Sequence, residues 1–327
     1  MKLKNAPISK YSQIKIGITF GDPSGIGPSI IAKALVSIGR LAQFVIIGDR
    51  RVFEQSGARG LSNLKNVRFV DLNNVAHKKF KFGKISAEYG RASIEYLNKA
   101  LELLVRDQID CLVTCPISKE AINLAGYRYL GHTEYLAQKT GSRNLGMMLL
   151  NQDLRFVLVT RHIAIKEVPK SLTKNIIFSL AILAQESLKK LFLIKNPRIA
   201  VCALNPHASD NGLIGDEESR IILPAIKKLR TKIRHIQGPL PADVAIAKAK
   251  NQEYDCVIAM YHDQALIPLK MLGSDTGVNL TLGLNFIRTS PLHGTAFDIA
   301  GTNLANPNAL IAAIKLAARC TANLKKA

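Results

Sequence analysis

The chain lacks any apolar segment long enough to cross a membrane, because nowhere in it do about eighteen uncharged apolar residues run together. Residues 1–15 are basic and lack the continuous apolar core of a signal peptide. Repeats, low-complexity tracts and Pro/Gly-rich linkers are also lacking. We therefore expect a soluble, cytoplasmic protein without a membrane partner, whose domain boundaries are not marked by composition.

Cysteine is scarce, and none of the five cysteines stands in the C-x-x-C spacing of zinc ribbons or thioredoxin-like sites. They occupy positions 111, 115, 202, 256 and 320. Four of them lie within or at the end of apolar, strand-like runs such as DCLVTC and YDCVIAM, where a free thiol behaves as a small hydrophobic group. We expect buried, reduced thiols.

Acidic residues are few, with 24 Asp and Glu against 45 Lys and Arg, which gives a formal net charge of +21. Such an excess attracts polyanions and speeds the capture of small anionic substrates. However, aromatic residues make up only 6% of the chain, and the lysines are spread along helix-like segments rather than gathered in a tail. We interpret the charge as a solvated surface and expect no nucleic-acid partner. A basic nucleic-acid-binding protein stays an alternative that rests on charge alone.

Short β-branched runs alternate with longer amphipathic patterns from end to end, and 47% apolar residues in 327 suffice for one large or two moderate domains. Alternation of this kind predicts the α/β class, with a mostly parallel sheet covered by crossover helices. The expected strands are 14–20, 44–49, 110–117, 156–160, 198–204, 255–260 and 277–283, and the expected helices are 86–106, 172–194, 216–231 and 306–322.

Polar and small residues gather where the predicted strands end, which is where open α/β sheets bind their ligands. The segment GDPSGIGP (21–28) follows the first strand and opens a helix, with Pro28 near the first helical position. Its glycines permit close approach of an anion to a helix N-terminus, but it matches neither G-x-G-x-x-G nor the Walker pattern. A tight turn explains it equally well.

Three histidines each follow a predicted strand: His162 in VLVTRHI, His207 in ALNPHAS and His262 in AMYHDQ. Three imidazoles with an open fourth position make a catalytic metal site. Their spacing carries no motif, so each could instead be a surface or hydrogen-bonded residue. What favours ligation is that all three have the same topological location.

Further candidates could hold an anion or a flat ligand. The segment GHTE (131–134) indicates the start of a helix, where an imidazole and free backbone amides are available to an anion. A plain helix cap explains the segment equally well. Lys270 and Arg288 bring two cations near a strand end, which suits a phosphate or carboxylate clamp, although either could be a solvated charge. The segment HGTAFDIAG (293–301) indicates a loop open to a flat ligand, or a simple helix connection.

Read together, these segments resemble the 4-hydroxythreonine-4-phosphate dehydrogenase family from about residue 14 to residue 318. The matching segments, in their expected order, are GDPSGIGP, CPISKEAI, GHTEYLA, LNPHAS with GDEE, GPLPADV, AMYHDQALIPLK and GVNLTLGLNFIRTSPLHGTAFDIAG. Six or more ordered matches are far more specific than any one of them.

The resemblance implies a role for each candidate residue. It implies that His162, His207 and His262 bind one divalent metal, with Zn, Mg or Co as candidates. It implies that the substrate is held by His132, Thr133, Lys270, Asn279 and Arg288, and that Asp243 also belongs to the active site. The segment HGTAFDIAG also looks like the adenosine-binding loop of β-decarboxylating dehydrogenases, so His293, Gly294, Thr295 and Asp298 are assigned to NAD or NADP.

The resemblance also implies two α/β/α subdomains with mostly parallel sheets, arranged as in isopropylmalate dehydrogenase rather than as a Rossmann domain. We expect the first subdomain to comprise residues 1–130 plus 290–327 and the second residues 131–289, with the active site in the cleft between them. The family is a homodimer whose active site is shared between subunits, and it acts on a small phosphorylated substrate.

The activity implied is metal-dependent oxidation of 4-phosphohydroxy-L-threonine by NAD or NADP. Decarboxylation to 3-amino-2-oxopropyl phosphate would follow, as a step in pyridoxal 5'-phosphate (vitamin B6) biosynthesis. A paralogous dehydrogenase of threonate or erythronate 4-phosphate is the first alternative. A phosphate acyltransferase of similar fold is the second, and the three histidines and HGTAFDIAG argue against it.

Overall fold

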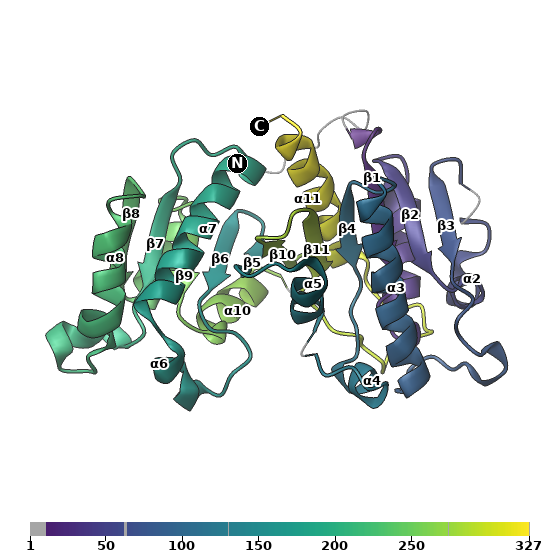
Figure 1. Cartoon of the computed structure of the whole chain (residues 1–327), viewed down its shortest axis with the longest axis horizontal. Helices are drawn as coiled ribbons and strands as arrows, with labels where there is room; N and C mark the ends of the chain where they lie inside the picture. The colour runs from purple at the N-terminus through teal and green to yellow at the C-terminus, as the bar shows by residue number, and fades with distance from the viewer. Residues whose placement is uncertain (1–10, 62–63, 130, 274, 327) are drawn as a thin grey trace. The chain divides into compact units, whose positions relative to one another are not determined.

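The computed structural model of the chain describes residues 11–61, 64–129, 131–273 and 275–326 (Figure 1). They group into two compact units. The central unit is Arg143–Gly283, and the flanking unit combines the segment that ends at Ser142 with the segment that begins at Leu284. Both units are built of alternating strands and helices, so the predicted α/β class is confirmed.

The sheet of the flanking unit is parallel throughout. Its strands are β1 (Lys15–Thr19), β2 (Gln43–Gly48), β3 (Val67–Asp71), β4 (Cys111–Thr114) and β11 (Ile287–Pro291), in the order β3-β2-β1-β4-β11. Every residue of β4 and β11 is buried, as expected of parallel strands that are covered on both faces. The carboxyl ends of β4 and β11 therefore lie at the same edge of the sheet.

Helices cover both faces of this sheet. The crossover from β1 to β2 runs through α1 (Gly27–Ile38), whereas the connection that returns to β4 runs through α3 (Ala87–Val105). Right-handed crossovers in opposite directions put these helices on opposite faces. α11 (Asn308–Leu324) packs beside α1, and α4 (Lys119–Leu124) packs beside α3. α2 (Arg50–Phe53) and α5 (His132–Thr140) complete the unit.

The sheet of the central unit is mixed. Its strands are β5 (Gly146–Asn151), β6 (Leu154–Leu158), β7 (Arg198–Cys202), β8 (His235–Leu240), β9 (Cys256–Ala259) and β10 (Val278–Leu282), in the order β10-β5-β6-β9-β7-β8. β5 is antiparallel to both of its neighbours, and the remaining pairs are parallel. The carboxyl ends of β6, β9 and β7 are therefore adjacent at one edge.

The helices of the central unit again lie on two faces. α7 (Lys174–Phe192) and α8 (Leu223–Leu229) pack together on one face, and α9 (Ala242–Lys250) and α10 (His262–Met271) cover the other. Figure 1 shows α7 in front of the strands and α10 behind them. Thr173 caps α7, because its hydroxyl accepts the backbone N–H of Ile176.

Helix α5 belongs to the flanking unit because of its packing. Tyr135 of α5 forms a buried cluster with Ile94 and Leu97 of α3 and with Ile122 of α4. β11 belongs there as well, since it pairs with β4. The contacts thus divide the chain after residue 142 and after residue 283. The subdomain boundaries expected from sequence, after 130 and before 290, stay a prediction.

All five cysteines are free and buried, as predicted. Burial raises the pKa of the Cys111, Cys202 and Cys256 thiols to about 12, so these groups stay protonated. Within the described ranges, no helix is both long and apolar enough to cross a membrane.

Candidate active site

Two of the three predicted metal ligands lie side by side in the central unit. His162 follows β6, and His262 is the first residue of α10, directly after β9. Because β6 and β9 are neighbouring parallel strands, both histidines are carried to the same edge of the sheet. Their ring centroids are 5.8 Å apart, with an interplanar angle of 52°. Two imidazoles at this separation can bind one ion.

His207 follows β7, the other neighbour of β9, but it lies on an unusual loop. Residues 207–211 all have positive φ angles, 52° at His207 itself, which non-glycine residues rarely adopt. The base of the loop is fixed by the buried carboxylate of Glu218, which accepts the backbone N–H groups of Leu204 and Asn205, both at 2.8 Å. The side chain of His207 is 76% exposed. A rigid base therefore carries an exposed imidazole.

The described residues contain no group of three or more His, Cys, Asp or Glu side chains arranged to hold a metal ion. The chemistry of the individual donors nevertheless suits one. The Nδ1 atom of His262 lies 2.6 Å from the Asp263 carboxylate, and that of His207 lies 3.2 Å from Asp210. A carboxylate on Nδ1 fixes the tautomer and leaves Nε2 as the ligand atom, a common arrangement around metal-binding histidines.

The flanking unit contains a buried cation at the end of its sheet. Arg288 lies on β11 and is only 2% exposed. Its Nε and Nη2 atoms both donate to the hydroxyl of Thr114, at the end of β4, over 3.1 and 2.6 Å. Burial lowers the pKa of Arg288 to about 10, while the nearby charge of Glu134 acts in the opposite direction. A buried guanidinium favours a nearby anion, and its planar fork suits the oxygens of a phosphate or carboxylate.

His132 lies close enough to Arg288 for the two groups to affect each other. Burial and the positive charge of Arg288 lower the pKa of His132 well below its ordinary value, so the imidazole is neutral at physiological pH. Its Nε2 atom is buried and has no hydrogen-bond partner. Thr133 is buried within the first turn of α5, whose N-cap is Gly131. His132, Thr133 and Arg288 are thus gathered in one unit, with polar atoms left for a ligand.

The remaining predicted substrate residues lie in the central unit. Lys270 is exposed near the end of α10, and Asn279 lies on β10 with a buried Oδ1 atom that has no partner. Asp243 is exposed in the first turn of α9, where its charge favours the helix N-terminus.

The segments GDPSGIGP and HGTAFDIAG pack against each other. The N–H of Ile26 donates to the carbonyl of Thr295 over 3.0 Å, and a Cβ atom on Gly25 would lie 3.1 Å from that same carbonyl. Glycine at position 25 therefore permits the close approach of the two loops. Pro28 lies in the first turn of α1, as predicted.

The loop assigned to the nicotinamide cofactor is open to a ligand. Nothing lies within 4 Å of a Cβ atom built on Gly294, and Asp298 is exposed. Nδ1 of His293 lies 3.0 Å from the Gly294 carbonyl, while its Nε2 is buried without a partner. Burial lowers the pKa of His293 and keeps the ring neutral. An open glycine beside an unsatisfied imidazole fits a flat, polar ligand.

Several polar residues around these groups were not predicted from the sequence. Thr114, which holds Arg288, is the last residue of a buried strand and carries no motif of its own. Asp263 and Asp210, which contact the imidazoles of His262 and His207, were visible as H-D and H-x-x-D pairs. A carboxylate next to a candidate ligand histidine is a signal that the sequence does offer.

A known family matches most of the chain. The family model described as "Pyridoxal phosphate biosynthetic protein PdxA" matches residues 40–317. The chain belongs to the PdxA family. It is 44% identical over 317 residues to the 4-hydroxythreonine-4-phosphate dehydrogenase of Sulfurihydrogenibium sp. (strain YO3AOP1), which covers 93% of this chain and 97% of that relative.

Two further relatives extend the match. This PdxA-family chain is 41% identical over 321 residues to the D-threonate 4-phosphate dehydrogenase of Salmonella typhimurium, over 92% of this chain and 97% of that one. The solved 4-hydroxythreonine-4-phosphate dehydrogenase of Klebsiella pneumoniae superposes with a TM-score of 0.84 at 35% identity, over 97% and 99% of the two chains. The predicted family, fold class and dehydrogenase class are confirmed, and PdxA membership identifies an oxidoreductase.

Proposed function

We propose that this PdxA-family chain oxidises 4-phosphohydroxy-L-threonine with NAD or NADP and then decarboxylates the product to 3-amino-2-oxopropyl phosphate, in pyridoxal 5'-phosphate biosynthesis. The observation that carries the proposal is the pair of imidazoles, His162 and His262, 5.8 Å apart at the ends of neighbouring parallel strands. The 44% identity to a relative with this named activity supports the choice of substrate.

We assign one divalent ion to His162, His262 and His207. These three imidazoles would hold the ion, which would supply Lewis-acid polarisation for the oxidation and positive charge for the decarboxylation. The carboxylates of Asp263 and Asp210 orient two of the rings. Zn is favoured by an all-nitrogen ligand set, and Mg and Co remain candidates on the same donors.

The phosphate of the substrate is assigned to the polar group of the flanking unit. Arg288 supplies a permanent charge and His132 a neutral imidazole, with the hydroxyl of Thr133 beside it in α5. Lys270 and Asn279 are assigned to the same substrate. Binding energy from a phosphate remote from the reacting carbon can be used to position that carbon, which raises the rate of the chemical step.

We assign the nicotinamide cofactor to His293, Gly294, Thr295 and Asp298, which would hold its adenosine end; the bound cofactor would supply the hydride acceptor. The glycine leaves room for a flat ring, and the buried Nε2 of His293 gains a partner when the cofactor binds. Asp243 is retained as a further active-site residue. We also propose that the chain acts as a homodimer, which sedimentation of the purified protein would test.

A second candidate function is oxidation of D-threonate 4-phosphate. It is favoured by a relative of that name at 41% identity, close to the 44% of the first relative. The two substrates share the phosphate, the carboxylate and the oxidised hydroxyl, so the residues assigned above serve either one. Comparing kcat/KM for both compounds decides between them.

The decisive experiment follows the reduction of NAD and NADP by the purified enzyme with each substrate, together with CO2 release. We expect 4-phosphohydroxy-L-threonine to be oxidised, His262→Ala to lose both activity and bound metal, and the exposed His235→Ala to keep both. No turnover of either substrate, or an active and metal-free His262 variant, would overturn the proposal.

A further inference from the structure

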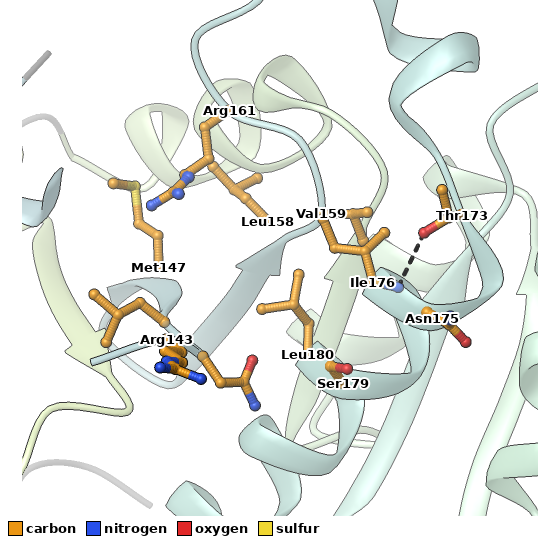
Figure 2. A pocket seen from close by; sticks show the side chains of 12 residues that line it. Arg143, Met147, Leu158, Val159, Arg161, Thr173, Asn175, Ile176, Ser179 and Leu180 are labelled. Atoms are coloured by element: carbon orange, nitrogen blue, oxygen red, sulfur yellow. Dashed lines mark hydrogen bonds between the residues drawn. The ribbon is translucent and has the colours of Figure 1, made fainter. Parts of the chain in front are cut away.

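A cavity of about 390 Å³ opens in the central unit, and none of the residues that line it has a role in the proposed reaction. Apolar side chains form part of its wall: Leu158 at the end of β6, Val159 after it, and Ile176 and Leu180 of α7 (Figure 2). Its volume lies within the range of small-molecule sites, about 300–1,000 Å³. The cavity has room for a compound with an apolar body.

Arg161 places a cation in this cavity (Figure 2). Its Nη1 atom is buried from solvent and has no hydrogen-bond partner. The backbone around it is fixed, because Thr160 donates to the Met260 carbonyl through both its N–H and its hydroxyl, over 3.1 and 2.7 Å. A buried cationic nitrogen without a partner is costly, and an anion bound beside it would offset that cost.

Two further features make the cavity favourable to an anion. The exposed Arg143 lies at the opposite end of the cavity from Arg161 (Figure 2). The N-terminus of the 19-residue helix α7 also reaches the lining, through Thr173 and Asn175, and contributes a positive partial charge. No Asp or Glu is among the lining residues. The positive charge of the cavity is therefore not neutralised from within its wall.

We propose that this cavity is a second ligand site, which binds a small organic anion with its phosphate or carboxylate group on Arg161 and its apolar body against Leu158, Ile176 and Leu180. None of the lining residues is assigned to substrate, metal or cofactor. The proposal stands whether or not the proposed reaction is correct, because it rests on the cavity, its two arginines and the Nη1 atom of Arg161, which has no partner.

The probes are 4-bromophenyl phosphate and 4-bromobenzoate, with 4-bromobenzyl alcohol as the neutral control. Because Arg288 offers another place for an anion, binding is titrated calorimetrically in an Arg288→Met background. We expect one molecule of each anion to bind, and the neutral probe to bind at least tenfold more weakly. Arg161→Met should weaken anion binding about tenfold or more, because it removes one charge-assisted hydrogen bond. The tighter of the two anions identifies the preferred group.

Arg143→Met tests the cavity independently, because this exposed side chain is replaced without disturbing the core, and it should weaken binding as well. Arg230→Met, an exposed arginine of the same unit, should leave affinity unchanged. In crystals grown with the phosphate probe, the bromine should give an anomalous peak among the apolar lining residues. Affinity unaltered by both Arg161→Met and Arg143→Met, or a bromine found only outside the cavity, would refute the site.

Discussion

Replacing Arg288 by methionine should weaken phosphate recognition strongly while changing the stability of the protein by a smaller amount. Methionine is similar in length to arginine and apolar, so it fills the same volume between β11 and β4. Arg288 is 2% exposed, and its Nε and Nη2 atoms donate to the hydroxyl of Thr114. In the proposed function the same guanidinium binds the substrate's phosphate, so the substitution removes that contact.

The magnitudes follow from the environment of the guanidinium. A pKa lowered from 12.5 to about 10 corresponds to roughly 3 kcal/mol of penalty on the charged form, at about 1.4 kcal/mol per pKa unit. Methionine relieves that penalty but leaves the Thr114 hydroxyl without its donors, which costs about 1–3 kcal/mol. These effects oppose each other, so the free energy of unfolding should change by less than about 2 kcal/mol.

No opposing effect offsets the loss of substrate binding. A charge-assisted hydrogen bond contributes about 1.5–3 kcal/mol, so its loss should raise KM for the phosphorylated substrate about 10- to 150-fold. Steady-state kinetics and urea unfolding measure the two quantities on the same preparation. Arg91→Met, an exposed arginine on α3, is the matched control and should change neither. An unchanged KM, or a large loss of stability, would refute this reasoning about Arg288.

Three further predictions concern the metal, a buried acid and a close backbone contact. His207→Ala should lose bound metal and turnover but keep its unfolding temperature, because the side chain is 76% exposed; full activity without metal would remove it from the site. Burial raises the pKa of Asp22 from 3.8 to about 6, so its contribution to stability is complete below 3.8 and is lost as the pH rises through 6. Relative to wild type, the free energy of unfolding of Asp22→Asn should therefore rise by roughly 3 kcal/mol between about pH 4 and pH 8, as measured by urea unfolding. A difference between the two proteins that does not change with pH would contradict this. Gly27→Ala should lower the free energy of unfolding by more than about 3 kcal/mol, because a Cβ atom there would lie 1.9 Å from the Phe20 carbonyl. Gly60→Ala should lower it by only about 1–2 kcal/mol, because Gly60 has a φ of +80° but open space around it. Equal unfolding free energies for the two alanine variants would be the contrary result.

Much of the fold could be predicted because the buried strands of a parallel sheet are continuous apolar runs. IKIGITF, DCLVTC and DCVIAM contain β1, β4 and β9, and the long amphipathic helices α3, α7 and α11 lie close to the expected ranges. Four strands escaped prediction. β3 (VRFVD) and β8 (HIQGPL) carry polar residues, β11 (IRTSP) contains a buried arginine, and β5 belongs to an antiparallel hairpin.

The candidate site could be predicted in its location more fully than in its geometry. Strand ends pointed to His162 and His262, and the structure brings those two rings together. The left-handed turn that carries His207 could not be foreseen, because none of the residues from 207 to 211 is a glycine. Likewise, nothing in the sequence indicates that Thr114 and Arg288, which are 174 positions apart, would be hydrogen-bonded.

The buried charge of Arg288 has a practical consequence for work at the bench. The guanidinium stays charged at neutral pH even though burial lowers its pKa to about 10, so an oxyanion from the solution can compete with the substrate's phosphate for it. Phosphate or sulfate buffers should therefore compete with substrate and raise its apparent KM, whereas Tris with chloride as its counter-ion should not. Crystals grown from ammonium sulfate should show a tetrahedral density at this guanidinium, which would mark the place of the substrate's phosphate without any substrate being added.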